Sequence, residues 1–255
     1  MDLSACPAAS SWLGYNAYVI VLSIDTCDSR GSVALLRDES VLGLIPHETR
    51  DEYSSWLLPA VKDLLKKAGL PMKDVSGYAV AAGPGSFTGV RVGLTTVKAW
   101  AEVYGKPVAA ISRLESIAAQ ATVPSGCLAA FVDAQRGQVF GAVYEKERDT
   151  LVRLAEEMVI APGRFVETAA ELSNGRKTSW VSPDAALLSA EPAWKQREKQ
   201  GEKIEQVSAT LAAVIGRIGL RQLKGGKTTD ALGLDANYVR RSDAEIFWKG
   251  AAHGH

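Results

Sequence analysis

The sequence predicts an α/β protein of two lobes, each lobe a sheet flanked by helices. Near-continuous apolar runs at residues 18–24 and 78–82 are typical of buried central strands. An amphipathic helix is predicted for residues 51–68, between these strands. A change of composition near Ser112 precedes further strands and a final helix at residues 208–223. The length of 255 residues suits either one large domain or two smaller ones that share an interface.

Composition indicates a globular protein and argues against a dedicated nucleic-acid binder. Hydrophobic residues make up 47% of the chain, and 29 Lys and Arg balance 29 Asp and Glu. This balance still leaves room for a local basic patch. Three widely spaced cysteines, Cys6, Cys27 and Cys127, form neither a disulfide framework nor a zinc pattern, which fits a reducing cytoplasm. No run reaches the roughly 20 apolar residues of a membrane span.

The first lobe is predicted to occupy residues 17–110, after a poorly ordered extension at residues 1–16. Residues 18–24 form a strand, residues 25–31 a turn and residues 32–36 a second strand. Residues 41–46 are a candidate third strand.

The helix at residues 51–68 has a stripe that faces the sheet, formed by Leu57, Val61, Leu64, Leu65 and Ala68. Gly69 and Pro71 end it. Tyr53, Trp56 and Ala60 lie off this stripe, where they are either the periphery of the core or part of a binding surface.

A glycine turn follows the strand at residues 78–82. Gly83, Pro84 and Gly85 break the strand, and Ser86 or Thr88 can cap a helix that runs to about Tyr104. Unpaired N–H groups at such a helix start can bind an anion. However, the loop lacks the lysine of a phosphate-binding Walker loop, and position 88 is Thr where a dinucleotide fingerprint needs Gly. Spacing alone leaves a nucleotide cradle and a plain strand-to-helix turn open.

The helix after this turn is apolar on two faces. One face carries Val90, Leu94, Val97 and Ala101; the other carries Val92, Thr96, Ala99 and Val103. Gly89 and Gly93, four residues apart, would let another helix approach. Such a helix is either fully buried or covered by a partner on its second face.

The second, smaller lobe is predicted for residues 111–225, followed by a tail at residues 226–255. Ser112 caps a short helix, and residues 127–132 and 138–144 form a hairpin. A helix at residues 162–172 and a strand end near residue 180 follow. The charged segments 145–157 and 191–206 are expected to be solvated.

The motif Gly83-Pro84-Gly85-Ser86-Phe87-Thr88-Gly89-Val90-Arg91 resembles the signature of the bacterial TsaB (YeaZ) family. Five other segments are also similar to that family, and together the matches span about residues 19–241. They are Ile24-Asp25-Thr26, Leu57-Leu58-Pro59, Ser112-Arg113-Leu114-Glu115, Asp133-Ala134-Gln135-Arg136-Gly137-Gln138-Val139-Phe140 and Asn237-Tyr238-Val239-Arg240-Arg241.

This resemblance implies two ribonuclease-H-like lobes of the actin/Hsp70-like ATPase superfamily, in a degenerate member with no catalytic residues and no metal ligands. It implies a non-catalytic scaffold that activates TsaD in the threonylcarbamoylation of adenosine 37 of tRNA. The implied partners are TsaD, the ATPase TsaE and, as substrate of the complex, tRNA; alone, the chain is expected to form a homodimer. ATP and Mg²⁺ are used by the complex, and no cofactor is expected on this chain alone.

The resemblance also implies site residues. The partner-binding surface, for TsaD or a second copy, is expected at Tyr53, Trp56, Ala60, Gly89, Val92, Gly93, Thr96, Ala99, Trp100 and Val103. The signature loop is expected at Gly83, Pro84, Gly85, Ser86, Phe87, Thr88, Gly89 and Arg91.

The alternative is an ATP-dependent kinase or ATPase of the same superfamily that uses Asp25 to hold a metal-bound phosphate. The competing interpretation is structural: Asp25 is a turn residue whose side chain bonds the nearby backbone. A peptidase is not supported, because His47 is the only histidine outside the C-terminal tail and no triad can be assembled around it.

Overall fold

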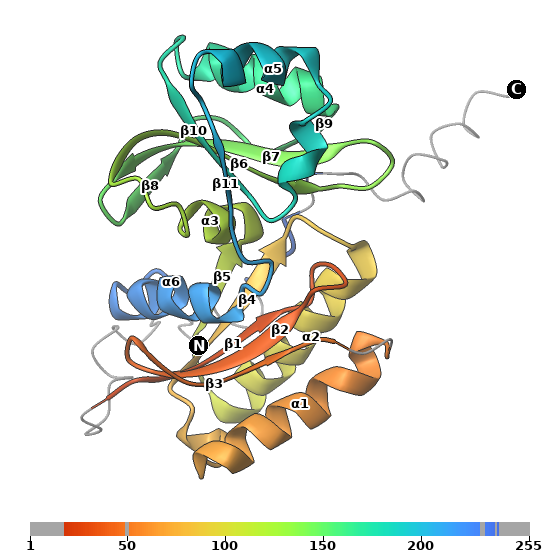
Figure 1. The fold of residues 1–255 in the computed structure, drawn as a ribbon. Helices are drawn as coiled ribbons and strands as arrows, with labels where there is room; N and C mark the ends of the chain where they lie inside the picture. The colour runs from red at the N-terminus through yellow and green to blue at the C-terminus, as the bar shows by residue number, and fades with distance from the viewer. Residues whose placement is uncertain (1–17, 49–50, 230–232, 238, 240–255) are drawn as a thin grey trace, which may run out of the picture. The chain divides into compact units, whose positions relative to one another are not determined.

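The computed structural model describes residues 18–48, 51–229, 233–237 and 239 (Figure 1). The chain divides into two compact units. Unit 1 contains the described residues up to Ala82, together with 88–111 and 210–236; unit 2 contains 83–87, 112–209 and the described residues from Asn237. No helix in these described ranges is both long and apolar enough to cross a membrane.

Within the described part of unit 1, sheet A contains five strands in the order β3-β2-β1-β4-β5. They are β1 (Ile20–Asp25), β2 (Ser32–Arg37), β3 (Ser40–Pro46), β4 (Gly77–Gly83) and β5 (Val108–Ser112). The first three strands are antiparallel neighbours, and β4 runs parallel to β1. Strands β1 and β4 are buried along their whole length, which confirms the two central strands that the apolar runs predicted.

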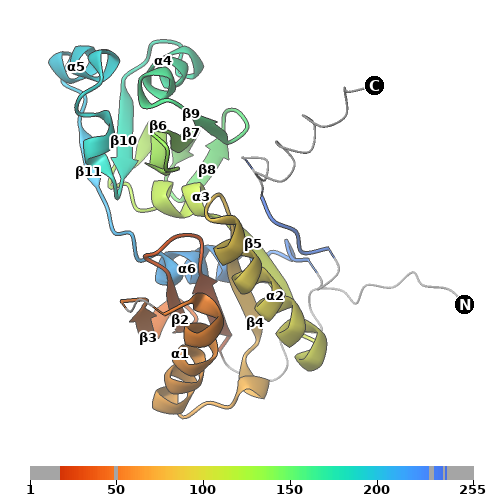
Figure 2. The same ribbon diagram turned by 90° about the vertical axis from the view of Figure 1, so that its right-hand side faces the viewer.

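Two helices lie side by side on one face of sheet A: α1 (Tyr53–Ala68), which is followed by the short η2 (Met72–Asp74), and α2 (Phe87–Tyr104) (Figures 1 and 2). In α1, Leu57, Val61, Leu64 and Leu65 of the stripe predicted to face the sheet are buried, and Ala68 is half-buried. Of the two apolar faces predicted for α2, the one with Val90, Leu94, Val97 and Ala101 is buried.

The helix α6 (Ala212–Lys224) covers the opposite face of sheet A. Gly216 lies against Leu36 and Ser23, whereas Gly93 of α2 lies near Ile24. Ser23 and Ile24 are successive residues of a strand, so they point to opposite faces. The Ser23 hydroxyl also donates to the Ala212 carbonyl at 2.7 Å, which fixes the start of α6 on β1.

The position of α6 corrects the predicted lobe boundary. Residues 111–225 were expected to form the second lobe, but residues 210–236 belong to unit 1. Beyond α6 the chain remains on this unit, because Val108 and Thr229 exchange two backbone hydrogen bonds of 3.2 and 2.9 Å. The order of elements along the chain does not reveal that α6 packs on β1, about 190 residues earlier in the sequence.

Within the described part of unit 2, sheet B contains six strands in the order β11-β10-β6-β7-β8, with β9 also paired to β7. They are β6 (Ser125–Asp133), β7 (Val139–Glu147), β8 (Thr150–Arg153), β9 (Met158–Ile160), β10 (Thr178–Ser182) and β11 (Ile204–Gln206). Strand β6 is antiparallel to β7 and parallel to β10. The neighbours of β6 thus repeat those of β1, and each unit is a ribonuclease-H-like lobe, as predicted.

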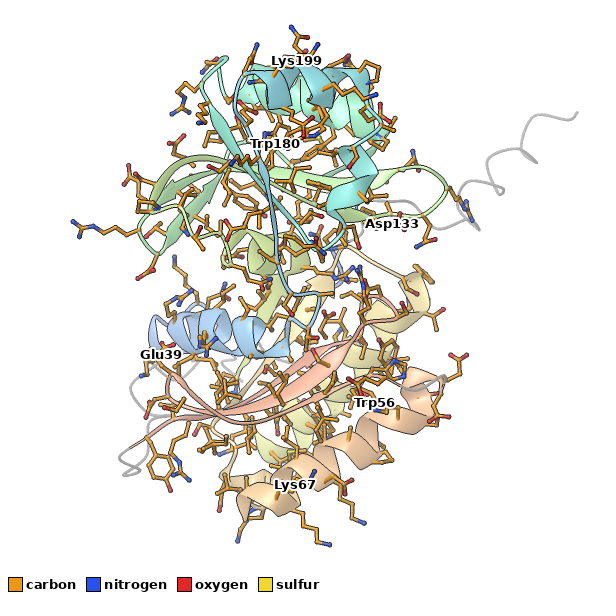
Figure 3. All side chains as sticks on the ribbon, viewed as in Figure 1. Glu39, Trp56, Lys67, Asp133, Trp180 and Lys199 are labelled. Carbon is orange, nitrogen blue, oxygen red and sulfur yellow. The ribbon has the colours of Figure 1, made fainter. Side chains whose placement is uncertain are left out.

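The helices of unit 2 lie on both faces of sheet B. The helix α3 (Arg113–Ala118) lies on one face, while α4 (Pro162–Leu172), η3 (Ala185–Leu188) and α5 (Pro192–Lys199) lie on the other. Between sheet B and α4 and α5, Trp180 packs edge-on against Phe165 and Trp194, with ring centroids 5.8 and 5.5 Å apart (Figure 3). Aromatic pairs at this geometry stabilise a core beyond the area they bury.

Two segments predicted to be solvated contribute to the interior instead. In 145–157, strand β7 continues to Glu147, β8 follows, and Lys146 and Glu157 are buried. In 191–206, Trp194 and Glu202 are buried. Glu202 accepts from the Trp180 indole at 2.7 Å and pairs with Arg197 at 2.9 Å. Paired charges can be buried, so charge density alone does not identify a solvated segment.

Candidate functional site: the outer face of α1 and α2

An open apolar groove of about 380 Å³ lies between α1, η2 and α2 in unit 1. Its lining is Leu58, Val61, Lys62, Leu65, Lys66, Leu70, Pro71, Met72 and Trp100. Leu58 is 55% exposed, although a leucine on a surface helix usually turns inward. The groove is the kind of concave apolar surface that an amphipathic helix can occupy.

The charge around this groove is positive. Lys62 and Lys66 contribute to its lining, one helical turn apart on α1, and Lys67 stands exposed at the C-terminal end of the same helix (Figure 3). The apolar lining is therefore accompanied by cations. An apolar side chain flanked by carboxylates would complement both features.

The exposed face of α2 continues the surface. Val103 is 74% exposed and Ala99 is exposed, while Val92, Thr96 and Trp100 are half-buried. These five residues of α2 belong to the predicted partner-binding set, and all five are at least partly exposed. Small and apolar side chains at these positions would let a second helix pack closely.

Three other predicted surface residues lie inside unit 1. Ala60 is buried on the inner side of α1. Gly93 faces sheet A, because a Cβ there would lie 2.5 Å from Thr26 Oγ1. The Thr26 hydroxyl donates to the Gly89 carbonyl at 2.7 Å, so Gly89 is also turned inward. Both glycines permit the approach of the protein's own sheet, and neither lies on the exposed face.

Tyr53 and Trp56 form an aromatic cluster with His47 at the start of α1. The His47 ring lies 4.5 Å from Tyr53 and 4.9 Å from Trp56, centroid to centroid. The Tyr53 hydroxyl accepts from the Gly31 N–H at 2.8 Å and donates to the Asp28 carbonyl. Burial raises the pKa of Tyr53, so the phenol stays neutral. Tyr53 therefore fastens the β1–β2 turn, while Trp56 remains partly exposed on α1 (Figure 3).

The signature loop joins β4 to α2. Gly83 has a φ of 113°, which favours glycine, and the Gly83–Pro84 peptide is cis. Pro84 is buried and Gly85 is half-buried; Ser86, Phe87, Thr88 and Arg91 are exposed.

Asp25 is fully buried at the end of β1. Its Oδ1 accepts from the Cys27 N–H at 2.9 Å, two residues along the chain. This is the backbone bond of a turn residue. Among the described residues, no three His, Cys, Asp or Glu side chains gather in a way that could hold a metal ion. Asp25 thus makes the backbone bond expected of a structural turn residue.

The sequence prediction missed two groups of residues. In the groove, Leu58 and Lys62 could have been found from their i, i+4 spacing on the solvent side of α1, whereas nothing in the sequence places Met72 beside them. Glu157 was assigned to a solvated segment, yet it accepts from the Asn237 side chain at 2.6 Å. No local pattern relates two residues 80 positions apart.

The comparisons with known proteins agree with one another. A family model described as "TsaD: tRNA N6-adenosine threonylcarbamoyltransferase" matches residues 34–214. The "tRNA threonylcarbamoyladenosine biosynthesis protein TsaB" of Escherichia coli is 32% identical over 238 residues, with 90% of this chain and 96% of that protein covered. The chain belongs to the TsaB (YeaZ) family. The Bacillus subtilis TsaB is 28% identical over 240 residues, covering 89% and 97% of the two chains.

A solved structure of YeaZ from Pseudomonas aeruginosa has the same fold as this TsaB-family chain. The two superpose with a TM-score of 0.70 at 23% identity, over 86% of this chain and 99% of that one.

Proposed function

We propose that this chain is a non-catalytic subunit that binds and activates TsaD in the threonylcarbamoylation of adenosine 37 of tRNA, with TsaE and ATP as further components. Membership of the TsaB family over nearly the whole chain is the observation that carries this proposal. The match to the TsaD family model relates this chain in sequence to its proposed partner.

The outer face of α1 and α2 is the proposed contact with TsaD. Its groove carries an exposed leucine and two lysines, and Val103 of α2 is the most exposed large apolar side chain among the described residues of unit 1. Exposed apolar side chains beside a groove are common at protein interfaces. The same surface would serve a homodimer in the absence of TsaD.

A reconstituted transfer reaction tests the role of the chain. TsaD and TsaE from the same organism, ATP, threonylcarbamoyl-adenylate and unmodified tRNA are combined with and without it, and modified adenosine is counted. We expect modification to require the chain, and the chain without TsaD to produce none. Full modification without it would overturn the scaffold role.

A matched pair of variants tests the surface. Val103→Glu places a charge on the outer face of α2, whereas Val152→Glu places one on β8 of unit 2, where the valine is 58% exposed. Burial of an unpaired carboxylate at an interface should weaken TsaD binding by at least about tenfold in Val103→Glu. Val152→Glu should bind as the unmodified chain does. Equal affinities would exclude the proposed surface.

The rival ATPase is tested by calorimetry of ATP with Mg²⁺ on the isolated chain. The hydrogen bond between Asp25 and Cys27 supports a structural role for this carboxylate, so we expect no saturable binding at micromolar ATP. Saturable binding that Asp25→Asn abolishes would favour the enzyme.

A further inference from the structure

Asn237 contacts the signature loop at Gly83. Both residues that meet, Gly83 and Asn237, belong to unit 2. A Cβ at Gly83 would lie 2.8 Å from the carbonyl oxygen of Asn237. Space and the φ of 113° therefore both require glycine at position 83. The backbone of Asn237 is packed directly against the first residue of the loop.

Asn237 is held in this position by a buried carboxylate. Its Nδ2 donates to Glu157 Oε2 at 2.6 Å, and the Glu157 side chain is only 2% exposed. The other oxygen, Oε1, accepts from the Ser112 hydroxyl and lies 3.4 Å from Arg153 Nη1. Burial raises the pKa of Glu157, and its hydrogen bonds partly oppose this shift. Both oxygens are thus bonded, and hydrogen bonds of this kind to a carboxylate are among the strong ones.

The remaining contacts fix Glu157 itself. Ser112 caps α3, because its Oγ accepts from the Glu115 N–H at 3.1 Å. The Glu157 carboxylate is therefore bonded to the residue that caps the start of α3. Glu157 thus links two segments that resemble the family, those beginning at Ser112 and Asn237, and the Asn237 backbone packs against a third at Gly83.

We propose that Glu157 and Asn237 are positioning residues: Glu157 holds Asn237, and the Asn237 backbone packs against Gly83. They thereby hold the signature loop in the conformation from which α2 begins at Phe87. Neither residue lines the groove. This inference rests on the proposed function, because the outer face of α2 is part of the proposed TsaD surface. It extends that function to Asn237 and the segment around it.

Hydrogen exchange of the full chain tests the fastening without any partner. In Asn237→Ala, the amides of Gly83, Gly85, Ser86 and Phe87 should exchange about ten- to a hundredfold faster, the factor that loss of a hydrogen bond to an ionised group supports. Amides in the centre of β6 and β7 should keep their protection. Unchanged exchange in the loop, or equal acceleration across sheet B, would overturn the proposal.

Asn237→Asp separates the specific hydrogen bond from general packing. The new carboxylate would face that of Glu157, with Arg153, Tyr144 and Glu115 as the other titratable groups near this cluster. Two like charges repel at neutral pH, whereas one shared proton restores a hydrogen bond in acid. Loop protection, corrected for intrinsic exchange rates, should return on acidification in Asn237→Asp and stay low in Asn237→Ala. Absence of recovery in Asn237→Asp would contradict the assignment.

Binding to TsaD distinguishes a failure of this inference from a failure of the proposed function. Asn237→Ala should weaken binding, although it lies outside the groove. If Val103→Glu binds normally, the surface proposal fails and the exchange result stands. If Val103→Glu blocks binding while Asn237→Ala leaves loop exchange and affinity unchanged, the surface stands and the positioning role is excluded.

Discussion

Gly93 shows how a single hydrogen atom in place of a side chain sets the distance between α2 and sheet A. Gly93→Ala would displace the Thr26 hydroxyl from its bond to Gly89. We expect a net loss of about 1–2 kcal/mol in the free energy of unfolding, because overpacking outweighs the helical preference of alanine. Urea denaturation measures this loss. In a Thr26→Ala background the same change should cost less, and an undiminished cost would contradict the contact.

Glu202 supports the aromatic core of unit 2 by satisfying three donors. It accepts from the Trp180 indole, the Thr178 N–H and Arg197. Glu202→Ala should lower the free energy of unfolding by about 3–5 kcal/mol, because the Arg197 cation, whose side chain is 13% exposed, and the buried Trp180 indole lose their acceptor. Glu198, exposed on α5, is the matched control, and Glu198→Ala should change stability by less than about 0.5 kcal/mol. Equal effects would contradict this role.

The raised pKa of Glu157 predicts how its contribution to the free energy of unfolding changes with pH. Burial raises its folded-state pKa above the ordinary value of about 4.3, so the folded protein binds more protons in the interval between the two values. The contribution of Glu157 to stability is therefore present below about pH 4.3 and is lost as pH rises through the raised value. Relative to Glu157→Gln, the unmodified chain should lose stability across this interval. A constant difference between the two proteins would show that the pKa is not raised.

At the scale of elements, the helices that cover sheet A could be predicted from the sequence and the short strands of unit 2 could not. The apolar residues of α1 and α2 repeat at helical spacing, so the local sequence is enough to predict an apolar face on each helix. Strands β8 and β11 lie in charged segments, are at most four residues long and are mostly exposed or half-buried. Their pairing depends on neighbours distant in the chain.

The same limit applies to the candidate site. Val92, Thr96, Ala99 and Val103 were placed correctly on a second face of α2, because periodicity distinguishes the two faces. Gly89 and Gly93 were placed on the wrong face, because a glycine in the sequence does not indicate whether a partner or the protein's own sheet approaches it. The groove depends on the proximity of Met72 and Trp100 to α1, which only the folded chain establishes.

The lysines of α1 give a prediction at this scale. Lys62→Glu with Lys66→Glu would reverse the charge at the groove, and we expect the association rate with TsaD to fall about tenfold at low salt. The effect should shrink as ionic strength rises. Lys67→Glu, on the same helix but outside the groove lining, is the control. An equal fall in both proteins would show only a general charge effect.

At the scale of the whole molecule, unit 1 depends on residues that follow unit 2 in the sequence. A chain that ends at Ala209 lacks α6 and exposes the side of β1 and β2 that α6 buries. We expect unit 1 to lose its amide protection while the aromatic core of unit 2 keeps its near-ultraviolet dichroism. A chain that ends at Lys227 retains α6 and should protect β1 and β2. Protection of these strands in the shorter chain would contradict the assignment of α6.

The return of α6 to β1 also has a consequence for synthesis on the ribosome. Residues 112–209 are contiguous and emerge before α6 does. At about 5–20 residues per second, roughly 5–20 seconds separate the end of α2 from the appearance of α6. During this time one side of the first sheet has no cover. When α6 appears, all strands of sheet B have already been made, because β11 ends at Gln206. The uncovered face of β1 and β2 is therefore the surface of the nascent chain to which we expect a chaperone to bind.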